Sequence, residues 1–130
     1  MTFRVKVYYE DTDAGGIVYH ANYLKFAERA RTEFLKEKGL SNRFFLERGM
    51  GIVACHAEID YYAPAFLEDE LDIETRILEV GKTSLLIEQE IFKDKTKLTR
   101  ILIKLVFVNK ETLRPIRVPD LIHETIKREE

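Results

Sequence analysis

Five stretches of this 130-residue chain alternate apolar and polar side chains, which is the period of a half-buried β-strand. The first stretch runs from Phe3 to Tyr9, with an apolar side chain at every second position. The later four have their apolar side chains at Val53, Cys55, Ala57, Ile59 and Tyr61, at Leu71, Ile73 and Ile77, at Leu85, Ile87 and Ile91, and at Ile101, Ile103, Leu105 and Phe107. Turn signals at Gly81–Lys82 and Lys93–Lys95 favour hairpin connections between the last strands.

A helical period separates the first strand from the other four. Its apolar positions i, i+4, i+7 and i+11 are Tyr23, Ala27, Ala30 and Phe34. This spacing predicts a helix from about Asn22 to about Lys38, with Asn22 as the N-cap and Gly39 just beyond the C-terminus. Shorter helical segments are expected over residues 41–48 and from residue 119 to about residue 128.

The order of one strand, a long helix and four hairpin-linked strands predicts an α+β fold in a single domain. The helix is expected to cover one face of an antiparallel sheet of about five strands. The other face carries Glu74, Arg76, Glu88, Glu90, Arg100 and Lys104. This charged face is predicted to meet water or another subunit, and pairing with a second copy would protect the sheet edges.

Composition narrows the class of protein. The chain is 45% hydrophobic and 34% charged, with a formal net charge of -2, so it is typical of a folded domain and shows no basic block for nucleic acid. Cys55 is the only cysteine, and we expect a buried structural thiol in a reducing compartment. With no apolar run of about 20 residues and no signal-peptide pattern, the expected location is the cytoplasm.

The segment from Tyr9 to Tyr23 combines three groups that can perform chemistry. Carboxylates lie on a Gly-rich turn, His20 follows Asp13 by seven residues, and the start of the predicted helix comes next. The first N–H groups of a helix have no partner within it, so they can stabilise a developing oxyanion. A carboxylate can attack a carbonyl carbon or activate water. These are the groups that acyl-transfer hydrolysis needs.

The same residues also have structural interpretations. Turns rich in Asp and Gly are usually only turns. Asp11 could brace the loop, His20 could make a structural hydrogen bond, and Lys82 could be a solvated charge. The spacing of Asp11 and Asp13 is that of a calcium loop, but the fifth loop position falls on Gly15, which has no side-chain oxygen. No metal site is therefore predicted.

Two sequence segments resemble the signature of the 4-hydroxybenzoyl-CoA thioesterase family. The first is Tyr8-Tyr9-Glu10-Asp11-Thr12-Asp13-Ala14-Gly15-Gly16-Ile17-Val18-Tyr19-His20-Ala21-Asn22-Tyr23. The second is Phe26-Ala27-Glu28-Arg29-Ala30-Arg31. The resemblance covers nearly the whole chain. It is nearest to the YbgC branch of acyl-CoA thioesterases, because Ala14-Gly15 and Tyr19-His20-Ala21 replace the Pro-Ala and Trp-Tyr-Pro of the 4-hydroxybenzoyl-CoA enzymes. It implies that residues 1–130 form one hotdog domain, in which a curved antiparallel sheet wraps a long helix.

Carried over residue by residue, the resemblance implies that Asp13 is the nucleophile or general base at the thioester carbonyl of an acyl-CoA. Tyr9 and His20 would assist, and the oxyanion donor would be a backbone N–H near His20. The positions implied in substrate binding are Gly16, Val18 and Tyr19 on the loop, and Lys82 at the CoA phosphates. Coenzyme A is part of the substrate, and no separate cofactor is implied.

The resemblance also implies a homodimer or homotetramer, because the family active site lies between subunits. Two other functions stay open on the same fold. One is a non-catalytic module that binds acyl-CoA or acyl carrier protein, and the other is a hydratase or dehydratase. Binding without release of thiol would favour the first, and hydration of an enoyl-CoA would favour the second.

Overall fold

The computed structural model describes the backbone of residues 2–129 and the side chains of residues 2–124. Its elements are β1 (Thr2–Lys6), the short 3-10 helix η1 (Tyr9–Asp11), α1 (Asn22–Glu37), α2 (Asn42–Glu47), β2 (Met50–Tyr61), β3 (Glu70–Val80), β4 (Ser84–Lys93), β5 (Thr96–Asn109) and α3 (Asp120–Glu129). The predicted order of strands and α-helices is confirmed, and η1 is an addition. Within residues 2–129, no helix is both long and apolar enough to cross a lipid bilayer.

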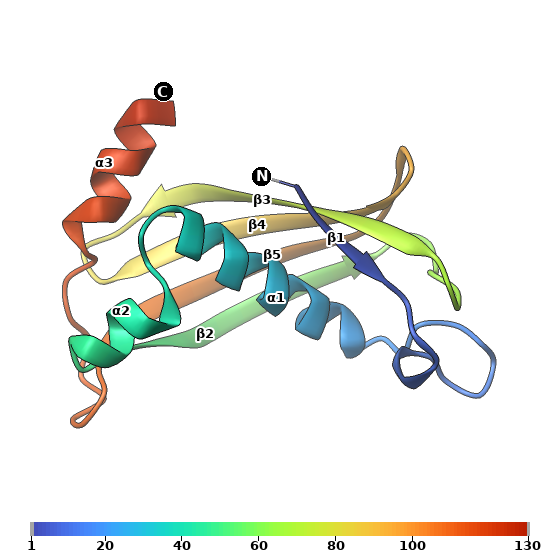
Figure 1. Ribbon diagram of the computed structural model, residues 1–130, viewed down its shortest axis with the longest axis horizontal. Coiled ribbons are helices and arrows are strands. Elements are labelled where there is room, and N and C mark those ends of the chain that lie inside the picture. Colours follow the sequence, from blue (N-terminus) through green and yellow to red (C-terminus); the bar gives the residue numbers. More distant parts are fainter. Residues whose placement is uncertain (1, 130) are drawn as a thin grey trace.

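The five strands form one antiparallel sheet in the order β1-β3-β4-β5-β2, so β1 and β2 are its edges. The sheet curves, and α1 lies across one of its faces (Figure 1). Because β1 and β2 flank the helical segment in the sequence but lie at opposite edges, the chain between them has to cross the sheet. This is the hotdog arrangement, and the predicted fold class is confirmed.

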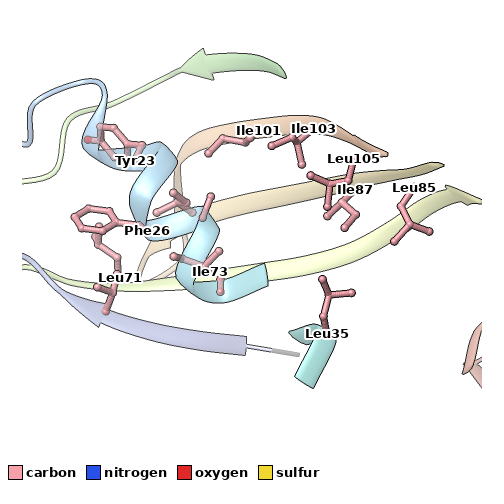
Figure 2. Close-up of a cluster of buried hydrophobic side chains, with 14 of the residues drawn as sticks. Tyr23, Phe26, Leu35, Leu71, Ile73, Leu85, Ile87, Ile101, Ile103 and Leu105 are labelled. Atoms are coloured by element: carbon pink, nitrogen blue, oxygen red, sulfur yellow. The ribbon is translucent and has the colours of Figure 1, made fainter. Parts of the chain in front are cut away.

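The hydrophobic core lies between α1 and the sheet face that it covers. Figure 2 shows Tyr23 and Phe26 of α1 beside branched side chains of the central strands. Fully buried members of this core are Phe26, Leu71, Ile73, Leu85, Ile87, Ile91, Ile101 and Phe107. Since burial contributes about 25 cal/mol per Å² of apolar surface, this contact is the main source of stability for the fold.

One polar side chain, Gln89, is buried within this core and connects helix to sheet. Its Nε2 donates to the backbone oxygen of Ala27 at 2.8 Å and to Oγ1 of Thr75 at 3.0 Å. Its Oε1 accepts from Nη1 of Arg31 at 3.0 Å. Because the amide has partners at both ends, its burial is tolerated and it fixes the position of α1 over β3 and β4.

The two ends of α1 differ in how well the sequence predicted them. Asn22 is not the N-cap, because Ala21 takes that place and the Asn22 amide donates to the backbone oxygen of Asp11 at 2.8 Å. The C-terminus is as predicted. Gly39 has a φ of 86°, a left-handed conformation that favours glycine, and the N–H of Leu40 donates to the Leu35 oxygen at 2.9 Å.

The first predicted strand is too long, and Tyr9 is not one of its buried positions. β1 ends at Lys6, and Tyr9 lies in η1 with 83% of its surface exposed. The cause is a local turn: Oδ2 of Asp11 accepts from the N–H of Tyr8 at 2.8 Å, and the Asp11 N–H donates to the Tyr8 oxygen at 2.9 Å. These two bonds end the extended chain before Tyr9.

The prediction that Cys55 is buried is also wrong, since its thiol is exposed. β2 is an edge strand, and α1 packs mainly on β1, β3 and β5, whereas Tyr23 of α1 meets β2 at Tyr61, the end of that strand. A register shift between Ala54 and His56 further interrupts the alternation along β2. The apolar positions near the middle of this strand are therefore uncovered in the single chain, and Val53 is 43% exposed.

The charged face of the sheet is less open to water than the sequence indicated, because Glu88 is only 5% exposed. Its two oxygens accept from Nε of Arg76 at 2.6 Å and from Nε of Arg100 at 2.8 Å. Burial alone would raise the pKa of Glu88, but the hydrogen bonds from the two guanidinium groups outweigh it, and the pKa lies below its ordinary value. The two arginines therefore neutralise the buried Glu88 carboxylate and satisfy its hydrogen-bonding capacity.

Candidate active site

Residues 12–18 of the predicted catalytic loop fold into a small hairpin beside the N-terminus of α1. Thr12 and Val18 form an antiparallel bridge, and the N–H of Asp13 donates to the Ile17 oxygen at 2.8 Å. Gly16 closes the turn with a φ of 78°, where a side chain would be strained. A second bridge joins Ile17 to Phe66 and attaches the hairpin to the segment between β2 and β3.

The carboxylate of Asp13 is exposed and held from one side. Its Oδ1 accepts from the N–H of Gly15 at 2.8 Å and from the N–H of Ile17 at 3.3 Å. Within the described chain, Oδ2 has no hydrogen-bond partner, so it is available to a substrate or water. A Cβ at Gly15 would lie 3.3 Å from Oδ1, so a larger residue there would crowd the carboxylate.

Asp11, in contrast, is a structural residue, as one of the two sequence interpretations expected. Its side chain is buried and accepts from the Tyr8 N–H. Its backbone oxygen accepts from the N–H of Tyr19 at 3.0 Å and from Nδ2 of Asn22 at 2.8 Å. Asp11 therefore connects the start of the loop to the start of α1, and this bracing sets the approach of the helix to the Asp13 hairpin.

The turn that leads into α1 offers free backbone donors. The Asn22 N–H donates to the Tyr19 oxygen at 2.9 Å, and the hydroxyl of Tyr61 donates to the His20 oxygen at 2.7 Å. The backbone N–H groups of His20 and Ala21 have no acceptor in the part of the chain that the structure describes. Unpaired N–H groups at a helix start carry positive dipole character and suit a developing oxyanion.

Among the described residues, neither of the side chains predicted to assist, His20 and Tyr9, makes a hydrogen bond or ion pair with Asp13. The His20 ring is exposed, with its centroid 4.4 Å from that of Tyr19 and 6.5 Å from that of Tyr61. Tyr9 projects from η1 into solvent. Tyr19, His20 and Tyr61 therefore form an aromatic cluster at the turn that carries the free donors, and Tyr9 makes no ring contact with this cluster among the described residues.

Three of the residues implied in substrate binding lie in different surroundings. Gly16 is half-buried in the hairpin turn, whereas Val18 is 4% exposed and packs in the core. Lys82 lies in the turn between β3 and β4, near α3 and at the end of the sheet away from the Asp13 hairpin (Figure 1). Within one chain, the fold does not bring Lys82 to Asp13.

A cavity of about 520 Å³ lies between α1, α2 and the first half of β2, and no residue of the 12–18 hairpin lines it. Its apolar lining includes Leu35, Leu40, Phe45, Met50, Ile52 and Leu105. Arg31 and Glu28 add charge to the wall. Burial lowers the pKa of Arg31, and the nearby Glu28 carboxylate opposes that shift. This cavity is therefore separate from the candidate catalytic carboxylate in the single chain.

The chemistry of this site is that of a carboxylate and oriented N–H donors. In residues 2–124, no three His, Cys, Asp or Glu side chains gather in a way that could hold a metal ion. Tyr61 is the site residue that local sequence does not reveal, because it lies 41 positions from His20. Only the path of β2 along the sheet edge brings its hydroxyl to the turn.

Comparison with known proteins gives the family. The sequence model of the thioesterase-like superfamily matches residues 7–126. A Haemophilus influenzae protein named acyl-CoA thioesterase YbgC is 40% identical over 91% of this chain and 88% of its own length. A Helicobacter pylori protein of the same name is 39% identical over 95% and 97% of the two chains.

Solved structures agree with these relatives. The structure of a probable thioesterase from Bartonella henselae superposes with a TM-score of 0.86 and 35% identity, covering 92% of this chain and 98% of the other. The sequence match and the fold match thus extend over nearly the same residues. The chain belongs to the thioesterase-like superfamily, as a YbgC-like thioesterase.

Proposed function

We propose that this protein hydrolyses the thioester of acyl-CoA to a free carboxylic acid and CoA, with Asp13 as its catalytic carboxylate. The observation that carries the proposal is the Asp13 side chain, held through one oxygen by two backbone N–H groups and free at the other. It lies on the same loop as the unpaired N–H groups at the start of α1. The names of the relatives, acyl-CoA thioesterase, support the substrate class.

Asp13 can act on the thioester carbonyl in two ways. As a general base, it takes a proton from a water whose oxygen attacks the carbonyl carbon. As a nucleophile, it attacks that carbon and forms a mixed anhydride, which water then hydrolyses. In both routes the C–S bond breaks, the sulfur leaves as a thiolate and takes up a proton, and the N–H groups of His20 and Ala21 stabilise the oxyanion.

The remaining loop residues have supporting roles in this proposal. The exposed imidazole of His20 can supply the proton that the leaving thiolate takes up. Tyr9 and Tyr19 present exposed aromatic side chains, 83% and 48% accessible, on which substrate can pack. Gly16 leaves the mouth of the hairpin free of side-chain atoms, since no heavy atom lies within 4 Å of the Cβ position it lacks.

We also propose that two copies complete each site, in a homodimer that can pair again into a homotetramer. β2 is an open sheet edge, and a second β2 can pair with it antiparallel about a twofold axis. Such pairing brings the Tyr61 end of one strand to the Met50 end of the other. Tyr61 contacts the turn that leads into α1, and Met50 lines the cavity. Each cavity would then face the partner's Asp13 hairpin.

The same pairing gives Lys82 a place near a catalytic site. The Phe107 N–H donates to the oxygen of Thr83 at 2.9 Å, and Phe107 pairs with Ile52 of β2. Lys82 thus lies toward the cavity end of the sheet, the end that meets the partner's hairpin. A compact ammonium charge there suits the phosphates of CoA.

A charged substitution on the open edge tests this arrangement. Val53→Lys is expected to lower the particle mass from a multiple of 15.3 kDa to 15.3 kDa and to lower thioesterase activity with it, because an edge lysine opposes strand pairing. Light scattering and an activity assay measure the two effects. Val53→Thr, which keeps a β-branched residue, is the matched control. A monomeric variant with wild-type turnover would contradict a site shared between copies.

Release of thiol from a panel of acyl-CoAs tests the function itself. We expect the wild-type protein to release CoA from at least one class among short, long and aromatic acyl groups, because the loop supplies both carboxylate and oxyanion donors. A thiol-reactive dye follows the reaction, and the free acid is identified by mass spectrometry. Acyl-CoA that binds without any thiol release would instead support a binding module.

A further inference from the structure

Tyr61 is the last residue of β2, and its side chain contacts the turn that starts α1. Its hydroxyl donates to the backbone oxygen of His20 at 2.7 Å. That oxygen has no helical partner, because the Leu24 N–H donates to Ala21 at 3.2 Å instead. In the described part of the chain, Tyr61 is therefore the only group that holds the His20 carbonyl.

The hydrogen bond from Tyr61 to the His20 oxygen also affects the N–H of Ala21. A trans peptide is planar, and its N–H points away from its C=O. The C=O of His20 and the N–H of Ala21 belong to the same peptide unit, so a fixed C=O direction fixes the N–H direction. The preceding unit is fixed in the same way, since the Tyr19 oxygen accepts from the Asn22 N–H at 2.9 Å. The hydrogen bonds to the carbonyl oxygens of Tyr19 and His20 therefore set the orientation of the free N–H groups of His20 and Ala21.

The Tyr61 ring is itself well placed to act as an anchor. It packs at 5.6 Å and 69° against the ring of Tyr23, which is 3% exposed and whose hydroxyl accepts from the Ala65 N–H at 3.1 Å. Burial raises the pKa of Tyr61, so the phenol stays protonated and remains a donor at neutral pH. A hydrogen bond to a peptide oxygen also polarises the unit and strengthens its N–H as a donor.

We propose that Tyr61 is a positioning residue, whose hydroxyl holds the His20–Ala21 peptide with its N–H directed at the oxyanion of the reaction. The inference rests on the proposed thioester hydrolysis. Its importance follows from how oxyanion donors work, since they stabilise the developing charge best when they need no reorganisation during the reaction. Without the phenol, water would take its place at the carbonyl and the turn could rotate.

Removal of the hydroxyl alone tests this role. Tyr61→Phe is expected to lower kcat about tenfold and to leave KM within about twofold, because the ring still packs and only transition-state stabilisation is lost. Tyr62→Phe is the matched control, since Tyr62 is its neighbour, is 56% exposed and has no hydroxyl partner among the described residues. It is expected to retain wild-type kcat.

A spectroscopic readout separates positioning from a general loss of structure. The backbone ¹⁵N resonance of Ala21 is expected to shift in Tyr61→Phe and to stay unchanged in Tyr62→Phe, because only the first loses a bond to the carbonyl of its peptide unit. The melting temperatures of both variants are expected to stay within about 3 °C of wild type, a difference typical of a weak neutral hydrogen bond.

The outcomes are distinct. Wild-type kcat in Tyr61→Phe would overturn the positioning role and leave the thioesterase function intact. A rise in KM at unchanged kcat would also overturn it, by assigning the hydroxyl to substrate binding. An inactive wild-type protein would remove both the function and the role that depends on it. A fall in kcat together with the Ala21 shift would support the inference.

Discussion

Asp13→Asn is expected to lower the rate of thioester hydrolysis by about three orders of magnitude, the size of effect seen when a catalytic group is removed. Asparagine has nearly the same shape, and its Oδ1 can still accept from the N–H groups of Gly15 and Ile17. What it loses is the anionic oxygen, which has no partner in the described chain and is the one that would attack carbon or take a proton. Thiol release at saturating acyl-CoA measures the change in kcat.

The control for this substitution is Glu10→Gln, which removes another exposed carboxylate three residues away. It is expected to keep wild-type kcat, because the Glu10 carboxylate makes no hydrogen bond or ion pair among the described residues. Circular dichroism and the melting temperature should be the same in wild type and both variants. If Asp13→Asn hydrolysed acyl-CoA at the wild-type rate, Asp13 could be neither nucleophile nor base, and the proposed mechanism would fail while the family assignment remained.

Much of the fold could be predicted because its signals are local. The period of apolar residues located α1, and the end of that helix at Gly39 followed from a left-handed position that glycine favours. The early end of β1 comes from a local turn at Asp11, but the errors at Cys55 and Glu88 come from long-range structure. The exposure of Cys55 depends on β2 being an edge strand that α1 does not cover, and the burial of Glu88 depends on two arginines from neighbouring strands.

The residues of the candidate site likewise differ in whether local sequence could predict them. Asp13, Gly16 and the helix start lie within one short loop, so a sequence motif could indicate them together. Tyr61 joins the site only through the antiparallel path of β2, and no spacing rule links it to His20. Lys82 and the cavity lie toward the other end of the sheet, and only a second copy of the chain would bring them to the loop. Sequence predicts groups that are close in the chain better than groups that folding or assembly brings together.

Phe26→Ala is expected to be the most destabilising of the proposed substitutions, with a loss of about 3–5 kcal/mol in the free energy of unfolding. Phe26 is fully buried on the sheet side of α1, near Leu71, and its ring packs edge-on against Tyr23 at 6.2 Å (Figure 2). Truncation to alanine removes the contact that seats the helix and leaves a cavity in a packed core. For a chain of this length the expected fall in melting temperature is roughly 10–18 °C.

Leu24→Ala is the matched control, because Leu24 lies on the same helix turn but is 39% exposed. Its expected cost is about 1 kcal/mol or less, as for most surface positions. Both variants should be melted at one protein concentration, since association of copies would add to the apparent stability. Equal losses in the two variants would mean that the core under α1 does not carry the stability assigned to it. A much larger loss in Phe26→Ala would show that the packing of α1 on the sheet is a main source of stability. The same packing positions the turn at the start of α1 that carries the proposed oxyanion donors.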